Sequence, residues 1–138
     1  MGRVLALDYG SKKIGVAISD PMKIIAKPLQ VIINKHIDKV VDELNILIKE
    51  FDVEVVLVGM PFTMKNTHSE QTDKVIKFID FLQKKIKIKI DTYDERLTSK
   101  MAEKSLVLQG IKTGYNKHEI DKAAAAIFLQ NYLDDPKK

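Results

Sequence analysis

The sequence predicts an α/β fold: a mixed five-stranded sheet, with an antiparallel three-strand meander plus two parallel strands, flanked by helices. Three observations lead to this prediction. Three strand-like segments come first with no helix between them, helical and strand-like segments alternate after that, and two of the strands are apolar almost throughout. Consecutive strands tend to pair antiparallel, β-α-β units pair parallel, and apolar strands are typical of sheets covered on both faces.

The meander is expected in the first quarter of the chain. Residues 3–8 (RVLALD) form an apolar run suited to a central strand, and residues 9–13 read as a turn in which Gly10 is free to take a positive φ. Residues 14–19 alternate large and small side chains and should pair back as a hairpin. Residues 29–33, which follow a proline, supply the third strand.

Helical and strand-like segments alternate from there on. The first helix is expected at residues 37–51, where apolar side chains share one stripe and Asn34 is placed to cap the helix. An apolar strand at 53–58 precedes a second helix, opened by a capping box of Thr67 and Glu70.

The last elements are a strand and two helices. Residues 86–92 alternate isoleucine with lysine, as in a half-exposed edge strand. A short helix at 98–109 should stop at Gly110, and a final helix should run from Asn116 to about residue 133.

The composition narrows the classes of protein to which the chain can belong. The 138 residues, 45% hydrophobic and 30% charged, suit a single globular domain spanning residues 1–138. Without cysteine there can be no disulfide and no thiolate metal site. No run is long enough to span a membrane and the start lacks a signal peptide, so we expect a cytoplasmic protein without a membrane partner. The net charge of +4 is compatible with a polyanionic partner, but a solvated lysine-rich surface explains it equally.

A few acidic residues lie beside strongly apolar runs. Asp8 ends the first apolar strand, where a rigid backbone can present a side chain to a ligand, although it could also cap the following turn. Asp94 and Glu95 follow the last strand, where Arg96 could pair with them at the surface.

Asp121 carries the sharpest signal of the group. It shares a helix face with Ala125, Phe128 and Tyr132, so its carboxylate should lie at the edge of a buried interface. A buried carboxylate needs a cation, a hydrogen-bond donor or a raised pKa. The alternative is an ion pair with Lys117, four residues earlier.

Together these acids are expected at three places, all at the ends of predicted elements and all on one side of the predicted sheet. Mg²⁺ prefers oxygen ligands, and two ions roughly 3.5–4 Å apart can support phosphodiester hydrolysis. The histidines, His36, His68 and His118, lack the spacing of zinc ligands and are expected at the surface or at helix caps, although His118 is close enough in sequence to touch the site of Asp121.

Four segments stand out in order along the chain: DYGSKKIGVAISDP (8–21), VGMP (58–61), YDERLTS (93–99) and KHEIDKAAAAIFLQNYL (117–133). They resemble the successive motifs of the YqgF family, also called RuvX or the pre-16S rRNA nuclease family, which is related to RuvC-type Holliday junction resolvases. The resemblance covers essentially the whole chain. It implies an RNase H-like fold and a role in maturing the 5′ end of small-subunit rRNA, and it marks Asp8, an acid of the Asp-Glu-Arg segment and Asp121 as the catalytic, metal-binding acids.

The sequence departs from the family pattern at two places. Asn66 and Ser69 stand where glycines are usual, although Asn66 tolerates left-handed geometry. The pair Lys12-Lys13 stands where arginine usually comes second, which keeps the charge and loses bidentate phosphate contact.

The choice between Asp94 and Glu95 depends on strand alternation. Read strictly, alternation groups Asp94 with the buried isoleucines of its strand and points Glu95 away from them. The strand boundary is fixed only to about 2–4 residues, however, and a glutamate reaches one methylene further toward Asp8 and Asp121. We therefore expect Glu95 to be the ligand and Asp94 to be a structural acid that pairs with the backbone or with Arg96.

The expected site therefore has two parts. Asp8, Glu95 and Asp121 are the catalytic residues and hold Mg²⁺ or Mn²⁺, and Lys12, Lys13, Arg96 and Lys117 contact nucleic acid.

The expected activity is that of a metal-dependent endonuclease on precursor rRNA, from a monomer or weak homodimer. The alternatives are a resolvase of branched DNA, which should dimerise to cut two strands symmetrically, and a non-catalytic rRNA-binding module. An ATP-dependent enzyme of the sugar kinase and actin class is excluded. Such enzymes close two domains of this kind around ATP, and 138 residues supply only one.

Overall fold

The computed structural model describes residues 2–60, 70–94 and 117–134, with residues 70, 71, 94 and 117–123 described by their backbone alone. Within these ranges the strands and helices follow one another in the expected order. They are β1 (Arg3–Tyr9), β2 (Lys13–Ser19), β3 (Ala26–Ile33), α1 (Ile37–Glu50), β4 (Val53–Met60), α2 (Glu70–Lys85), β5 (Lys89–Asp94) and α4 (Lys117–Asp134).

The five strands form one mixed sheet in the order β3-β2-β1-β4-β5. β2 pairs antiparallel with both β1 and β3, while β4 pairs parallel with both β1 and β5. The predicted meander and parallel pair are therefore confirmed. β1 occupies the centre, as its apolar sequence predicts, because a central strand is covered on both faces.

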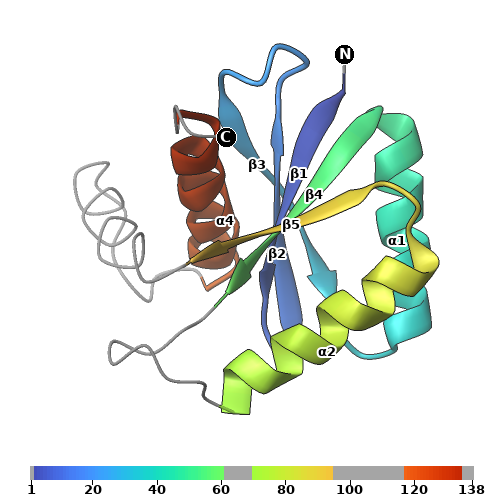
Figure 1. Ribbon diagram of the computed structural model, residues 1–138. Coiled ribbons are helices and arrows are strands. Elements are labelled where there is room, and N and C mark those ends of the chain that lie inside the picture. The colour runs from blue at the N-terminus through green and yellow to red at the C-terminus, as the bar shows by residue number, and fades with distance from the viewer. Residues whose placement is uncertain (1, 61–69, 95–116, 135–138) are drawn as a thin grey trace.

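Helices cover both faces of the sheet, with α1 and α2 on one side and α4 on the other (Figure 1). Alternate residues of β1 divide between two cores: Leu5 and Leu7 join the core under α1 and α2, while Val4 and Ala6 join the core under α4. Ala125 is fully buried in the second core, where its small side chain lets α4 approach the sheet closely. The apolar stripe of α1 is confirmed, since Val40, Val41, Leu44 and Leu47 are buried.

Two strand boundaries differ from the prediction for identifiable reasons. β3 begins at Ala26 and includes Pro28, because the strand lies at the edge of the sheet and an irregularity opposite Val16 and Ala17 accommodates the extra residue. β5 begins at Lys89 because α2 extends to Lys85 and the N–H of Ile86 still donates to the carbonyl of Leu82, at 2.7 Å.

Two predicted turn and cap roles were wrong. His36, not Asn34, occupies the N-cap position of α1, and its side chain makes no capping hydrogen bond. Gly10 does not adopt a positive φ. The predicted cap at Thr67, the helix at 98–109, and His68 and His118 as surface or capping residues cannot be compared, because residues 67, 68 and 98–109 lie outside the described ranges and residue 118 is described by backbone only.

Within the described ranges, none of the helices is both long and apolar enough to cross a membrane.

Phe128→Ala should remove the largest fully buried side chain described on α4, which packs against the sheet. Phe128 is 1% exposed, and truncating a buried phenylalanine costs about 3–5 kcal/mol. Denaturant unfolding should show a loss of that size. Ile46→Ala, at a side chain 63% exposed on α1, is the control and should change the free energy of unfolding by less than about 0.5 kcal/mol. Equal losses in the two variants would contradict this packing.

Candidate active site at the carboxyl ends of the parallel strands

Asp8 lies in a row of residues that crosses the sheet near the carboxyl ends of β1, β4 and β5. Asp8 pairs with Gly15 of β2. Leu7 pairs with Val58, so the next residue, Asp8, is level with Gly59, and Gly59 pairs with Tyr93. The aspartate therefore stands between two glycines, one on each neighbouring strand.

The row faces α4. Val4 and Ala6 pack in the α4 core, and alternation places Asp8 on that same face. Tyr9 turns to the opposite face, where its ring lies 4.6 Å from that of Phe78 in α2. Asp8 is half-buried. A half-buried carboxylate on a rigid strand is suited to hold a cation or a hydrogen-bond donor at a fixed position.

The turn after Asp8 is held by residues distant in sequence. The side-chain amide of Asn34 donates to the carbonyl of Gly10 at 2.7 Å, and the backbone N–H of Asn34 donates to the carbonyl of Lys12 at 2.8 Å. A Cβ at position 10 would lie 2.5 Å from the carbonyl oxygen of Lys13, so this turn requires glycine because of close approach. Asn34 therefore fixes the β1–β2 turn where the sequence suggested that it caps a helix.

Two contacts fasten α4 to the edge strand β5. The hydroxyl of Tyr132 donates to Asp91 Oδ2 at 3.0 Å, and the rings of Phe128 and Tyr93 stack with centroids 5.7 Å apart. From the first contact to the second, the helix position moves back by four residues, from Tyr132 to Phe128. The strand position moves forward by two residues, from Asp91 to Tyr93. The helix therefore runs antiparallel to β5, and its N-terminal turns lie toward the strand end that carries Asp94.

Asp121 belongs to those N-terminal turns. It precedes Phe128 by seven residues, or about 10 Å along the helix axis, and shares the face of Phe128 and Tyr132. Its backbone is helical, while its side chain and that of Lys117 lie outside the described part of the chain, so a pairing between them is not tested.

Some of the other predicted site residues are described by the structure and some lie outside the described ranges. Asp94 ends β5 and its backbone pairs with Met60, whereas Glu95 and Arg96 fall outside the described ranges. Lys12 is exposed and Lys13 half-buried, directly after the turn that follows Asp8. Among the described side chains, no three acidic or histidine groups gather closely enough to hold a metal ion. The structure thus brings Asp8, Lys12 and Lys13 to one end of the sheet.

Comparison with known proteins shows the family. The RuvX model, described as Holliday junction resolvase, matches residues 2–135. The chain belongs to the RuvX family. A RuvX relative from Desulforamulus reducens, named "Putative pre-16S rRNA nuclease", is 45% identical over 99% of each chain. A relative of the same name from Clostridium novyi is 39% identical over 96% of this chain and 98% of its own.

Solved structures show the same fold. RuvC of Thermus thermophilus, in complex with a Holliday junction substrate, has a TM-score of 0.58 at 14% identity, covering 96% of this chain and 94% of RuvC. The fowlpox virus resolvase, in complex with Holliday junction DNA, also has a TM-score of 0.58, at 13% identity and with 95% and 96% covered. The RNase H-like fold is confirmed, and this RuvX-family chain is a nuclease by class, a hydrolase of phosphodiester bonds.

Three features of the site escaped the sequence analysis. The glycine-flanked row depends on the register of three strands, and the Asn34 clamp joins segments 24 residues apart. The bond between Tyr132 and Asp91 joins residues 41 apart. Of these features, only the bond to Asp91 left a local sign in the sequence. Asp91 is an acid within a strand of isoleucines and lysines, where a carboxylate needs a hydrogen-bond donor or a cation.

Tyr132→Phe tests the contact between α4 and β5. Burial, together with the hydrogen bond and negative charge of Asp91, raises the pKa of Tyr132 to about 12. Because the folded pKa exceeds the unfolded value of about 10, the stabilisation is complete below pH 10 and is lost as the pH rises toward 12. We expect Tyr132→Phe to lower the free energy of unfolding at neutral pH by about 1 kcal/mol.

The same variant should remove the highest-pH step from the ultraviolet titration of the tyrosines. Tyr9→Phe is the matched control, which should leave that step in place. A highest step that survives Tyr132→Phe would show that Tyr132 is not held by Asp91.

Proposed function

We propose that this chain is a metal-dependent endonuclease that processes the 5′ end of precursor 16S rRNA in the cytoplasm. The observation that carries the proposal is the position of Asp8, on a strand paired on both sides, between Gly15 and Gly59, and facing α4. The names of the RuvX-family relatives point to precursor 16S rRNA as the substrate class.

The donor atoms fit a hard divalent cation. Asp8 offers carboxylate oxygens from a backbone fixed by two neighbouring strands, and oxygen ligands are those that Mg²⁺ and Mn²⁺ prefer. We assign Asp8, Glu95 and Asp121 as the residues that hold the cation. When bound, such a cation offsets the negative charge that develops on the phosphate during hydrolysis.

Strand alternation supports Glu95 as the second acid. Ile88 and Ile90 pack in the core under α1 and α2, while Asp91 and Tyr93 face α4. If the alternation continues by one more step, Glu95 faces α4 together with Asp8, and Asp94 faces the other way. Asp121 approaches the same region from the N-terminal part of α4.

The lysines supply the second half of the proposal. Lys12 and Lys13 lie at the Asn34-clamped turn directly after Asp8, and we assign their ammonium groups to phosphates beside the acids. Arg96 and Lys117 flank Glu95 and Asp121 in the sequence and are assigned the same role. These contacts release counterions, and the affinity for nucleic acid should therefore fall as salt is added.

Resolution of branched DNA is the second candidate. The description of the RuvX model and the fold shared with two resolvases solved on Holliday junctions favour it. A resolvase cuts two strands symmetrically and therefore needs a dimer. A cleavage assay distinguishes the two candidate functions. Purified protein is incubated with precursor rRNA or with four-way DNA junctions, each in the presence of Mg²⁺, Mn²⁺ or EDTA. Cleavage of the junction by a dimer, with intact rRNA, would replace the rRNA proposal.

Asp8→Asn should abolish cleavage and leave the fold intact. The amide keeps the size of the side chain and loses the charge that holds the cation, so we expect a fall in kcat of at least about hundredfold. Asp80→Asn, at an exposed carboxylate of α2, is the control. Turnover near that of the wild type in Asp8→Asn would remove Asp8 from the mechanism.

Glu95→Gln and Asp94→Asn should affect different properties. We expect Glu95→Gln to lose cleavage at least about hundredfold with an unchanged melting temperature, because it loses a metal ligand. Asp94→Asn should lower the melting temperature first and keep most of the activity. Single-turnover cleavage and thermal unfolding measure the two effects, and the opposite pattern would exchange the assigned roles.

A further inference from the structure

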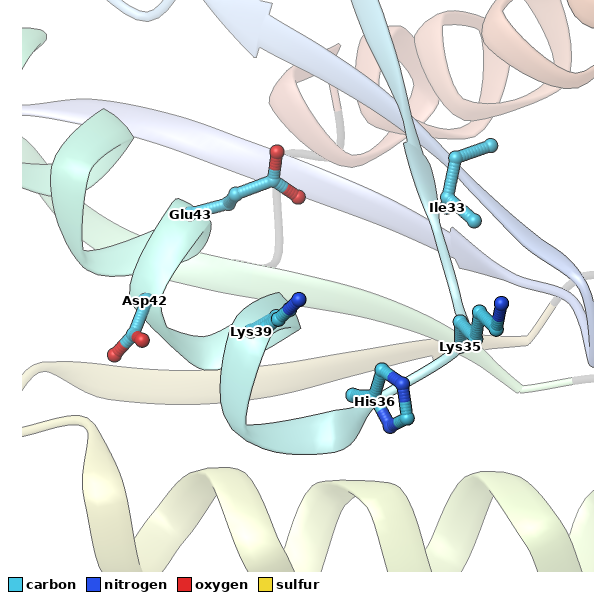
Figure 2. A pocket seen from close by; sticks show the side chains of 6 residues that line it. All are labelled: Ile33, Lys35, His36, Lys39, Asp42 and Glu43. Carbon is cyan, nitrogen blue, oxygen red and sulfur yellow. The ribbon is translucent and has the colours of Figure 1, made fainter.

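A cavity of about 440 Å³ lies between the end of β3 and the first turns of α1 (Figure 2). Its lining residues are Ile33, Lys35, His36, Lys39, Asp42 and Glu43. A volume of this size falls within the range of about 300–1,000 Å³ that is usual for small-molecule sites. None of these residues belongs to the set of acids and basic side chains assigned above.

The cavity is joined to the Asp8 turn through backbone pairing. Ile33 pairs with Lys13, and the next residue, Asn34, donates to the carbonyls of both Gly10 and Lys12. Two strand spacings separate β3 from β1, or about 10 Å. The cavity therefore lies at the same end of the sheet as Asp8, but on the side of α1, whereas Asp8 faces α4. The segment that leads to the cavity is fixed to the β1–β2 turn.

The lining offers both cations and apolar surface. Lys35, His36 and Lys39 are all exposed, and they lie at the start of α1, nearest the turn that carries Lys12 and Lys13. Asp42 and Glu43 follow about one helical turn later, so the positive charge gathers at the end next to the turn (Figure 2). Ile33 keeps 59% of its surface exposed, which is high for a large apolar side chain.

This combination matches the chemistry of one unpaired nucleotide. The two lysines can neutralise its phosphate, and the His36 ring with the Ile33 side chain gives a base a surface to stack on. Asp42 and Glu43 can accept hydrogen bonds from exocyclic amino groups. A purely anionic ligand would make no use of Ile33 or of the acids.

We propose that this cavity binds an unpaired nucleotide of the substrate strand, on the α1 side of the sheet end that carries Asp8, so that the strand passes around the β1–β2 turn from the phosphate cleaved at Asp8. The inference rests on the proposed nuclease function and extends it. It adds Lys35, His36 and Lys39 to the nucleic-acid interface, and it implies a preference for substrates with a single-stranded segment beside the cleavage position.

The first test measures binding of a fluorescein-labelled single-stranded oligoribonucleotide in EDTA, across a salt series. In Lys35→Gln/Lys39→Gln the affinity should fall at least about tenfold, and the slope of log K against log[salt] should lessen by about 1.4, as expected for two lost contacts with a single strand. Lys27→Gln/Lys49→Gln removes the same charge from exposed positions at the other end of the sheet and should change neither quantity.

The second test separates a nucleotide site from a general anion site. His36→Ala should weaken binding of the oligoribonucleotide about fivefold or more and leave binding of an abasic strand of the same length unchanged. Equal effects on the two probes would overturn the assignment of a base to this cavity.

The failure of this inference can be told apart from failure of the proposed function. If the wild type cleaves its substrate while both double variants bind like the wild type, the cavity is not part of the interface. If the wild type cleaves neither RNA nor branched DNA with any metal, the proposed nuclease function fails. In that case Lys35→Gln/Lys39→Gln still decides whether the cavity binds nucleic acid.

Discussion

The site depends on the pairing of β1 with a strand on each side. The antiparallel partner β2 and the parallel partner β4 both hold the backbone near Asp8, and the two residues level with Asp8 on these strands are glycines. The backbone is therefore rigid at a position where the two neighbouring strands contribute glycines. A carboxylate on a backbone fixed in this way is held at a defined position, which is what a ligand for a small cation requires.

The packing of α4 supplies the second constraint. Ala125 lets the helix approach the sheet, while Phe128 and Tyr132 contact consecutive α4-facing residues of β5. Gln130 adds a clamp at the far end, since its side chain accepts from the N–H of Ala26 and donates to the carbonyl of Ile24. The C-terminal part of the helix is thus fixed against both edges of the sheet, and the direction of the helix places the N-terminal turns, which carry Asp121, toward the end of β5.

The order of strands and helices along the chain could be predicted because apolar runs, alternation and helical stripes are local patterns with a direct physical cause. The sequence could not predict the clamp by Asn34, since an asparagine two residues before a helical N-cap reads as a capping residue and its true partner, Gly10, lies 24 residues away. The start of β3 was predicted too late because a proline such as Pro28 normally ends a strand. An edge strand tolerates a proline, and β3 lies at the edge of the sheet. The role of Asp91 was missed because its donor comes from a helix 41 residues further on.

The most direct test of the central claim is where a divalent cation binds. Addition of substoichiometric Mn²⁺ to isotope-labelled protein broadens the amide signals nearest the ion. We expect Gly15 and Gly59, which flank Asp8, to broaden first, and Met22 and Ile24, at the opposite end of the sheet, to remain sharp. Asp8→Asn should abolish the effect. Signals of Gly15 and Gly59 that stay sharp, or broadening that persists in Asp8→Asn, would contradict a metal site built on Asp8.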